Sequence, residues 1–264
     1  MTVGISWLFP GGRVNASRDA QTSSLSEDAQ QLLDSLTPEE RVGQLFLVSF
    51  QGMQVDASSK IYDLITNHHI GGVVLKAAND NFTDEAGAMS QVLIMNRQLQ
   101  LDRWSVSQQP RPDVVSGQEY TPAFIPLFIG ISQEGDGFPN DQILSGLTQL
   151  PDEMAIGATW NPKLAATVGT VLGQELSSLG INLLLGPSLD VLADPRPLGA
   201  NTLGTRTFGG DPYWVGLMGQ AFISSLHEGS NGKLAVIAKH FPGIGAADRL
   251  PQEEVATVRK SLEQ

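Results

Sequence analysis

Short apolar runs alternate with longer helical patterns along most of this chain. Each run is rich in Val, Ile or Leu and is bounded by Gly, Pro or Asn, which predicts a short buried strand. Between most of the runs, apolar residues recur at the spacing of a helix face. Strands that alternate with helices in this way are typical of a parallel α/β sheet. The predicted strands are residues 45–50, 71–76, 126–134, 181–185 and 234–238.

Start signals mark several of the predicted helices. Thr37, Pro38 and Glu40 form a capping box with a proline in the first turn. Asp211-Pro212 is typical of a helix N-cap followed by a proline. Two further helices are predicted to begin at Thr37 and at Thr83, and the second of them ends near residue 101. The other predicted helices span residues 26–36, 58–67, 161–179, 211–227 and 251–264.

Other stretches predict less regular structure. Residues 1–24 lack periodicity and are rich in Gly, Ser, Asn and Gln, which predicts a disordered lead-in before a domain at residues 25–264. Residues 105–122 predict a long polar loop that is either functional or mobile. His68 and His69 follow a predicted helix end, where the helix dipole favours a cation.

Composition and charge narrow the class of protein. The 264 residues are 41% hydrophobic and 17% charged, which is typical of globular protein with one large domain or two small ones. The net charge of −12 argues against binding to nucleic acid or to an anionic membrane, since both require basic patches. No apolar run approaches the ~20 residues of a membrane span, and without cysteine there is no disulfide framework. A neutral or cationic ligand fits better, and a sugar is neutral. The sequence leaves location and oligomeric state open.

Polar side chains follow three of the predicted strands at their carboxyl ends. Ligands bind at this end of the strands in parallel α/β folds, so the side chains predict a binding pocket. Asp194 and Asp211, taken singly, are explained as well by a salt bridge and by a helix N-cap. The pocket candidates are Ser132, Gln133 and Glu134 after the third strand, Asp190 after the fourth, Lys239 and His240 after the fifth, and Arg206 in a loop.

Motifs for other chemistries do not match. The sequence contains neither the phosphate-binding Gly-x-x-x-x-Gly-Lys-Ser/Thr nor a Gly-x-Gly-x-x-Gly after a strand. His227-Glu228 lacks a second His at helical spacing, which argues against a zinc site. Residues 130–134 lack the final Gly of a nucleophile elbow. The sequence therefore predicts no metal and no cofactor.

Three of the strand-end segments resemble the catalytic domain of glycoside hydrolase family 3, which includes β-glucosidases and β-N-acetylhexosaminidases. They are Gly-Pro-Ser-Leu-Asp-Val at 186–191, Gly-Thr-Arg-Thr-Phe-Gly-Gly-Asp-Pro at 204–212 and Lys-His-Phe-Pro-Gly-Ile-Gly at 239–245, in the family's order. The likeness covers roughly residues 36–250. It implies a (β/α)8 TIM barrel, of which this chain holds the first five β/α units, since five strands are predicted and eight are needed.

The resemblance also implies an activity, the retaining hydrolysis of β-linked glucosides or N-acetylglucosaminides without a cofactor. Charged donors form strong hydrogen bonds with sugar hydroxyls in a partly dry pocket. The residues that the resemblance assigns to sugar binding are Arg206, Lys239 and His240, with Asp190, Ser132 and Glu134 beside them.

Two positions depart from the family's pattern. Ser132 stands where the family usually has an Asp that binds sugar hydroxyls. Asp248 matches the position of an acid/base Asp, but the His that completes the hexosaminidase dyad does not follow it. A retaining glycosidase needs two carboxylates, and the family's nucleophilic Asp lies on a later strand than Lys-His. The resemblance thus implies a chain truncated before the nucleophile.

Two alternatives belong to other classes. A catalytically silent carbohydrate-binding or scaffold protein on the same fold would bind sugar without turnover. An unrelated flavodoxin-like protein would be complete with five strands, in the order 2-1-3-4-5.

Overall fold

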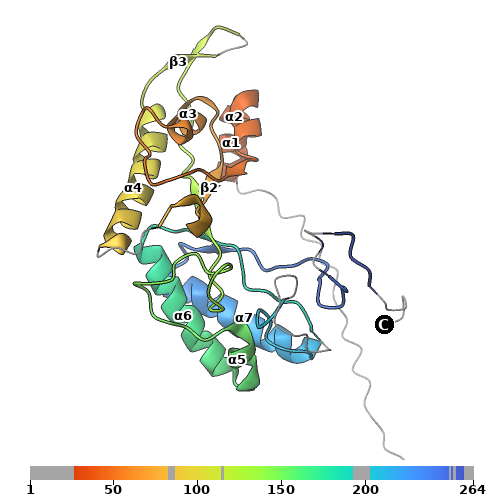
Figure 1. The fold of residues 1–264 in the computed structure, drawn as a ribbon. Helices are drawn as coiled ribbons and strands as arrows, with labels where there is room; N and C mark the ends of the chain where they lie inside the picture. Colours follow the sequence, from red (N-terminus) through yellow and green to blue (C-terminus); the bar gives the residue numbers. More distant parts are fainter. Residues whose placement is uncertain are drawn as a thin grey trace, which may run out of the picture. The chain divides into compact units, whose positions relative to one another are not determined.

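A computed structural model of the chain describes residues 27–82, 87–113, 116–192, 203–249, 251 and 254–258. The chain divides into two compact units, Met1–Ser35 and Leu36–Gln264. In the first unit the structure describes helix α1 (Glu27–Ser35), close to the predicted bounds. The second unit contains the sheet and the other helices (Figure 1). The predicted lead-in, the Thr83 cap and Asp194 lie outside the described residues.

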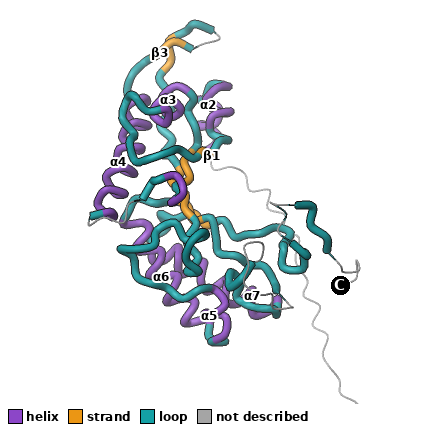
Figure 2. The backbone as a smooth tube through the Cα atoms, in the orientation of Figure 1, coloured by secondary structure: helices purple, strands orange, loops and turns teal. Residues whose placement is uncertain are grey.

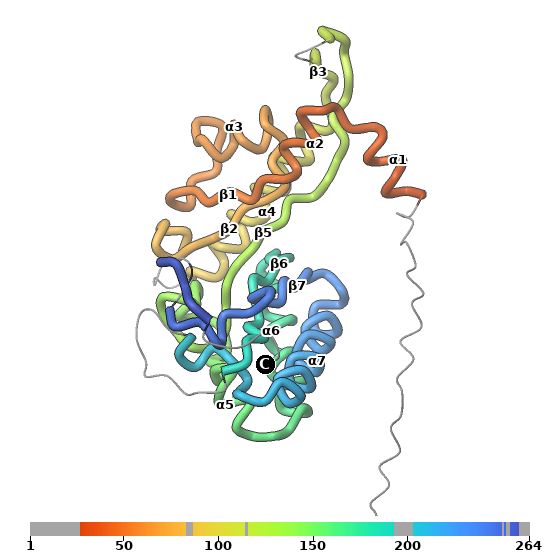
Figure 3. Tube along the Cα trace, turned by 90° about the vertical axis from the view of Figure 1, so that its right-hand side faces the viewer, coloured from red at the N-terminus to blue at the C-terminus, as the bar shows by residue number. Residues whose placement is uncertain are grey.

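The second unit is built on a five-stranded sheet in which every pair of neighbours is parallel. The strands follow one another in chain order, β1-β2-β5-β6-β7, as Figure 3 shows. This order confirms the predicted parallel α/β sheet and contradicts the flavodoxin-like alternative, which requires 2-1-3-4-5. The strands are β1 (Leu47–Val48), β2 (Gly72–Val74), β5 (Phe128–Ile131), β6 (Leu183–Leu184) and β7 (Ala235–Val236).

Three helices of this unit begin where their capping signals place them, after Thr37, Asn161 and Asp211, whereas the helix predicted from Thr83 is described from Ala88. Thr37 accepts from the Glu40 backbone while the Glu40 side chain accepts from Thr37, so the predicted capping box is present. The side chains of Asn161 and Asp211 also cap their helices, because each accepts from backbone N–H of the first turn. Figure 2 shows how short the strands are beside the helices. The helices are α2 (Pro38–Gly43), α3 (Lys60–Asn67), α4 (Ala88–Val106), α5 (Glu153–Ala158), α6 (Pro162–Ser178) and α7 (Pro212–Gly229), with a 3-10 turn at Ala77–Asn79.

Helices α6 and α7 lie side by side (Figures 1 and 3). Their close approach depends on glycine, because a Cβ atom on Gly169 would lie 2.3 Å from the Phe222 carbonyl oxygen. The central strands β2, β5 and β6 bury apolar side chains, which form one core with those of the helices, whereas the edge strands β1 and β7 are only partly buried. Fully buried members of this core include Val73, Ile129, Ile131, Leu176, Leu184, Met218 and Leu226.

Three predictions of local structure are wrong. The predicted loop at 105–122 contains the end of α4 and a hairpin of β3 (Arg111–Pro112) and β4 (Glu119–Tyr120). Helix α5 was not predicted, because its six residues are too few to show a helical period. The predicted tail helix is absent from residues 254–258, where Val258 instead forms an antiparallel bridge with Ala247. A long-range contact therefore overrides the local helical pattern of the tail.

The two histidines after α3 differ from one another. His68 ends the helix and lies 3.7 Å from the Asp63 carboxylate, which suits the predicted cationic role. His69 is buried, and its pKa is lowered from 6.5 to about 4 by burial and then by the positive charge of Arg103. The predicted cationic role is therefore wrong for His69, which is neutral near pH 7.

Candidate active site

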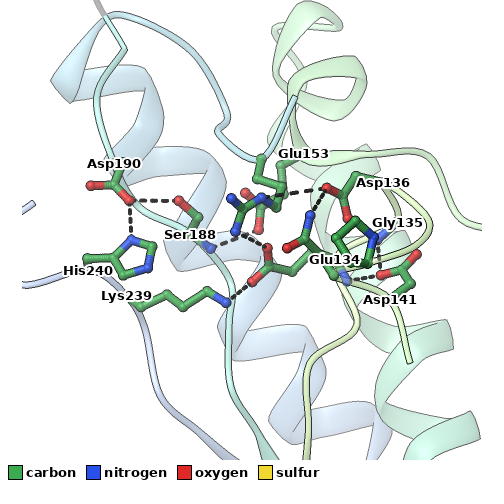
Figure 4. A network of polar contacts seen from close by, with 12 residues as sticks. Glu134, Gly135, Asp136, Asp141, Glu153, Ser188, Asp190, Lys239 and His240 are labelled. Carbon is green, nitrogen blue, oxygen red and sulfur yellow. Dashed lines mark hydrogen bonds and ion pairs between the residues drawn. The ribbon is translucent and has the colours of Figure 1, made fainter. Parts of the chain in front are cut away.

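The segments that follow β6 and β7 bring the predicted site residues Asp190 and His240 together. Ser188 and Lys239 form a parallel bridge just beyond the strands, with hydrogen bonds of 2.6 Å from Leu189 N–H to the Lys239 carbonyl and 3.0 Å from Lys239 N–H to the Pro187 carbonyl. The Lys239–His240 peptide bond is cis. Two residues beyond Ser188, the chain presents Asp190 to the imidazole of His240, 2.7 Å away (Figure 4).

Asp190 is held as a carboxylate by three donors. Its Oδ2 accepts from His240 Nδ1 and from the Ser188 hydroxyl at 2.9 Å, and its Oδ1 accepts from Ile244 N–H at 2.5 Å. Burial alone would raise the pKa of Asp190, but these hydrogen bonds outweigh burial and hold the pKa below its ordinary value. Because an ionised carboxylate only accepts hydrogen bonds, His240 Nδ1 must carry a proton. Nε2 is then the ring nitrogen of His240 that remains for a further hydrogen bond.

Glu134 gathers two cations from other parts of the chain. Its side chain is 1% exposed, and it forms ion pairs with Lys239 from the end of β7 and with Arg206, whose Nη1 lies 3.7 Å from Oε2. Arg206 Nε also lies 3.6 Å from Asp136 Oδ2. The Lys239 and His240 side chains remain 21% and 22% exposed, so both reach the surface of the site while the carboxylates beneath them are buried.

The loop after β5 is organised by Asp141, a residue that the sequence analysis missed. Its carboxylate accepts from the backbone N–H groups of Glu134, Gly135 and Gly137 at 2.5, 2.9 and 3.0 Å. Gly135 and Gly137 have φ of 84° and 79°, which favours glycine. The signal in the sequence is an Asp four residues after a Gly-x-Gly turn, a pattern that suits side-chain capping of a turn.

A second buried carboxyl, Glu153 at the start of α5, was also missed. Its Oε1 accepts from Ser188 N–H at 2.8 Å, which joins α5 to the end of β6. Burial, and then the charge of Glu134, raise its pKa well above the ordinary value. We call the six residues that meet here the carboxyl-end network; they are Glu134, Glu153, Asp190, Arg206, Lys239 and His240.

Comparison with known proteins decides the family. The family model described as "Glycosyl hydrolase family 3 N terminal domain" matches residues 37–264. The chain belongs to this family. The predicted resemblance is therefore confirmed.

Relatives in family 3 carry names of two related activities. The chain is 31% identical over 190 residues to "Beta-hexosaminidase A" of Pseudoalteromonas piscicida, a match that covers 70% of this chain and 27% of the relative. It is 34% identical over 127 residues to "Beta-N-acetylglucosaminidase/beta-glucosidase" of Cellulomonas fimi, covering 48% of this chain and 21% of the relative. The chain thus spans well under half of either relative.

Solved structures agree in fold. A family 3 β-N-acetylglucosaminidase from Paenibacillus sp. str. FPU-7 superposes with a TM-score of 0.70 and 28% identity, covering 86% of this chain and 37% of that one. A β-N-acetylhexosaminidase from Beutenbergia cavernae superposes with a TM-score of 0.60 and 28% identity, covering 80% of this chain and 56% of that one.

Ser132 and Asp248, the two other predicted site residues, make contacts with their own neighbouring segments. Ser132 directly follows β5 and is half-buried. Its backbone carbonyl accepts from Gln142 N–H at 3.3 Å. The Asp248 carboxylate accepts from Thr257 N–H at 2.8 Å and lies 3.3 Å from Arg249 Nη2. The roles predicted for these two residues stay predictions.

A cavity of about 270 Å³ lies beside the network, under the loop that follows β5. Glu134 and Glu153 line it together with apolar residues such as Ile156 and Phe222, whereas Lys239 does not. The surface on which the cations are exposed is therefore separate from this cavity. Across the residues that the structure describes, no group of three or more His, Asp or Glu side chains suits a metal ion, and no helix is long and apolar enough to cross a membrane.

Proposed function

We propose that this chain forms the sugar-binding part of a retaining β-glycosidase that acts on β-linked glucosides or N-acetylglucosaminides and needs no cofactor. The observation that carries the proposal is the convergence of Lys239, Arg206 and His240 on buried carboxylates at the strand ends. Family membership and the names of the relatives support it.

In this proposal the exposed donors bind sugar hydroxyls. Lys239 and Arg206 each carry a charge that strengthens such a hydrogen bond, and Glu134 holds both side chains in place. His240 presents Nε2 to the sugar because Asp190 occupies Nδ1. Ser132 offers a neutral hydroxyl to the same ligand.

We further propose that the sheet is the first five units of a (β/α)8 barrel. Five parallel strands in chain order, with helices between them, suit that architecture. A retaining mechanism needs a nucleophile and an acid/base. We assign the nucleophile to a strand later in the barrel than Lys239-His240 and keep Asp248 as the candidate for the acid/base.

The test uses the chain as it stands. Calorimetric titration with 4-nitrophenyl β-glucoside and with 4-nitrophenyl N-acetyl-β-glucosaminide should give binding of at least one glycoside and none of 4-nitrophenol alone. Absorbance of released 4-nitrophenol measures turnover in the same samples. If neither glycoside binds to the folded chain, the proposed function is wrong.

A second candidate, sugar binding without catalysis on the same fold, is favoured by two positions. Ser132 replaces a carboxylate of the family pattern, and Asp248 has its carboxylate engaged by Arg249 and by Thr257 N–H. A longer protein that contains the remaining strands distinguishes the two candidates. Binding with release of 4-nitrophenol supports the glycosidase, and binding without release supports the silent protein.

A further inference from the structure

Glu153 lies at the junction between the two halves of the carboxyl-end network. Its residue is 1% exposed, and Oε1 accepts from Ser188 N–H, whose own hydroxyl donates to Asp190. Glu153 is therefore one hydrogen-bonded residue away from the Asp190–His240 pair. Its other oxygen, Oε2, is buried and has no hydrogen-bond partner among the described residues.

Burial and the negative charge of Glu134 disfavour an ionised Glu153 side chain and outweigh the opposite effect of Lys239 and Arg206. The facing charged groups are Glu134 from the loop after β5, Lys239 from the end of β7 and Arg206 from the loop before α7. Glu134 forms the ion pairs with both cations. A second buried carboxylate would have a charged oxygen without a hydrogen bond, and buried charges of that kind are neutralised by taking up a proton.

The surroundings of Glu153 are consistent with a neutral acid. The cavity of about 270 Å³ beside Glu153 is lined by apolar residues of α5, α6 and α7 and by polar residues of the loop after β5. Burial and the charge of Glu134 also raise the pKa of Glu153 well above its ordinary value.

We propose that Glu153 is a positioning residue that works as the neutral carboxylic acid. Its Oε1 fixes the Ser188 backbone at the end of β6, and its proton leaves the negative charge of this region on Glu134. Lys239 then faces one buried carboxylate, that of Glu134, instead of two, and Arg206 faces those of Glu134 and Asp136 without a third. The role in sugar binding rests on the proposed function, whereas the protonation state does not.

Ionisation of Glu153 would change the site in a defined direction. A second carboxylate would compete with Glu134 for Lys239 and Arg206 and would draw their side chains inward, away from a ligand. Sugar affinity should therefore fall as the pH rises through the titration of Glu153.

The first experiment is infrared spectroscopy of the full chain near pH 7. The wild type should show a protonated-carboxyl C=O band that Glu153→Gln removes. The matched control is Glu175→Gln, because Glu175 also accepts a backbone N–H, from Thr148, but at the surface; it should leave the band unchanged. If Glu153→Gln removes no band, Glu153 is ionised and the inference is wrong.

The second experiment measures 4-nitrophenyl glycoside affinity against pH. Gln mimics the neutral acid, so Glu153→Gln should bind within about twofold of the wild type at low pH and should lose the wild type's decline at high pH, about tenfold if one charge-assisted hydrogen bond is lost. Loss of binding by the folded Glu153→Gln chain at every pH would overturn the inference. If the wild type binds no glycoside, the proposed function fails, and the infrared result still decides the protonation state.

Discussion

Two buried polar clusters stand at opposite ends of the same sheet. The carboxyl-end network follows the strands, whereas a second cluster precedes them and consists of Glu40, His69, Arg103 and Tyr120, which we call the amino-end cluster. Both contain ionisable side chains that are almost completely buried. They differ in what those side chains bind.

The amino-end cluster uses its bonds on the protein itself. The Glu40 oxygens accept from Thr37 N–H at 2.9 Å and from Ala123 N–H at 3.1 Å. Arg103 donates to the carbonyls of Ile125 and Ala123 and reaches His69 Nδ1 at 3.0 Å. Because these hydrogen bonds are made mainly to backbone groups of distant segments, the amino-end cluster stabilises the packing of those segments against one another.

The carboxyl-end network contains oxygen atoms that have no hydrogen-bond partner in the part of the chain that the structure describes. Its main contacts join side chains to side chains, and the Glu134 and Glu153 Oε2 atoms lack hydrogen-bond partners among the described residues. Lys239 and His240 are partly exposed above them. The two clusters are therefore similar in burial and charge and differ in their hydrogen-bond partners. The structural cluster binds mainly backbone groups, and the candidate binding site binds mainly side chains.

Removing the central cation of the amino-end cluster should give the largest loss of stability. Arg103→Ala leaves the Ile125 and Ala123 carbonyls without their donor and removes the positive charge that acts on buried Glu40, and it should lower the free energy of unfolding by about 3–5 kcal/mol. Arg97→Ala, on the exposed face of the same helix, should cost less than about 0.5 kcal/mol. Urea denaturation measures both. Equal effects would remove the structural role of Arg103.

Acid should weaken the amino-end cluster through His69. The pKa of His69 is about 4 in the folded chain against 6.5 unfolded, so the unfolded state takes up the proton first as the pH falls. Stability should drop by about 3 kcal/mol between these two values and then level off. His69→Asn should abolish this part of the slope in urea unfolding curves, and His68→Asn, at the exposed neighbour, should keep it.

Replacing the carboxylate beneath His240 should have a smaller effect on stability and a clear effect on binding. Asp190→Asn removes the acceptor that fixes the His240 ring, which should cost about 1–2 kcal/mol and weaken glycoside binding by about tenfold. The pKa of Asp190 is below 3.8 in the folded chain, so its contribution is present above that pH and is lost as the pH falls through the folded value. The variant should lose this acid dependence; unchanged affinity would separate Asp190 from the site.

The smallest effect on stability should come from the residue next to His240. Phe241 is 99% exposed, so Phe241→Ala should change the free energy of unfolding by less than about 0.5 kcal/mol. Phe208→Ala, which removes a ring that is 4% exposed and packs on Phe222, should cost about 3–4 kcal/mol. Thermal unfolding compares the two, and a large loss from Phe241→Ala would show packing at the site that the structure does not contain.

The sequence predicted what local patterns encode. Capping residues such as Thr37 and Asp211 act within one helical turn, and the five strands are marked by their own apolar runs. It also placed Lys239, Asp190 and Glu134 at strand ends, which meet because parallel strands end at one edge.

What the sequence did not predict depends on contacts between distant segments. Glu153 belongs to the site because of Ser188, 35 residues away, and no local pattern records that bond. The tail pattern suggested a helix, yet Asp248 binds Thr257 instead. The local pattern predicted a helix-end cation at His69, whereas in the structure Arg103, 34 residues away, lies beside it.

The most direct test of the account is the glycoside affinity of Lys239→Met, measured by calorimetry beside Arg103→Ala and Lys233→Met under conditions where circular dichroism shows all of them folded. Lys233 is exposed just before the same strand, so it controls for the loss of a positive charge. The account predicts that Lys239→Met loses about 10- to 100-fold in affinity and that the other two variants bind like the wild type. Wild-type affinity in Lys239→Met would contradict the claim that the carboxyl-end network binds the sugar.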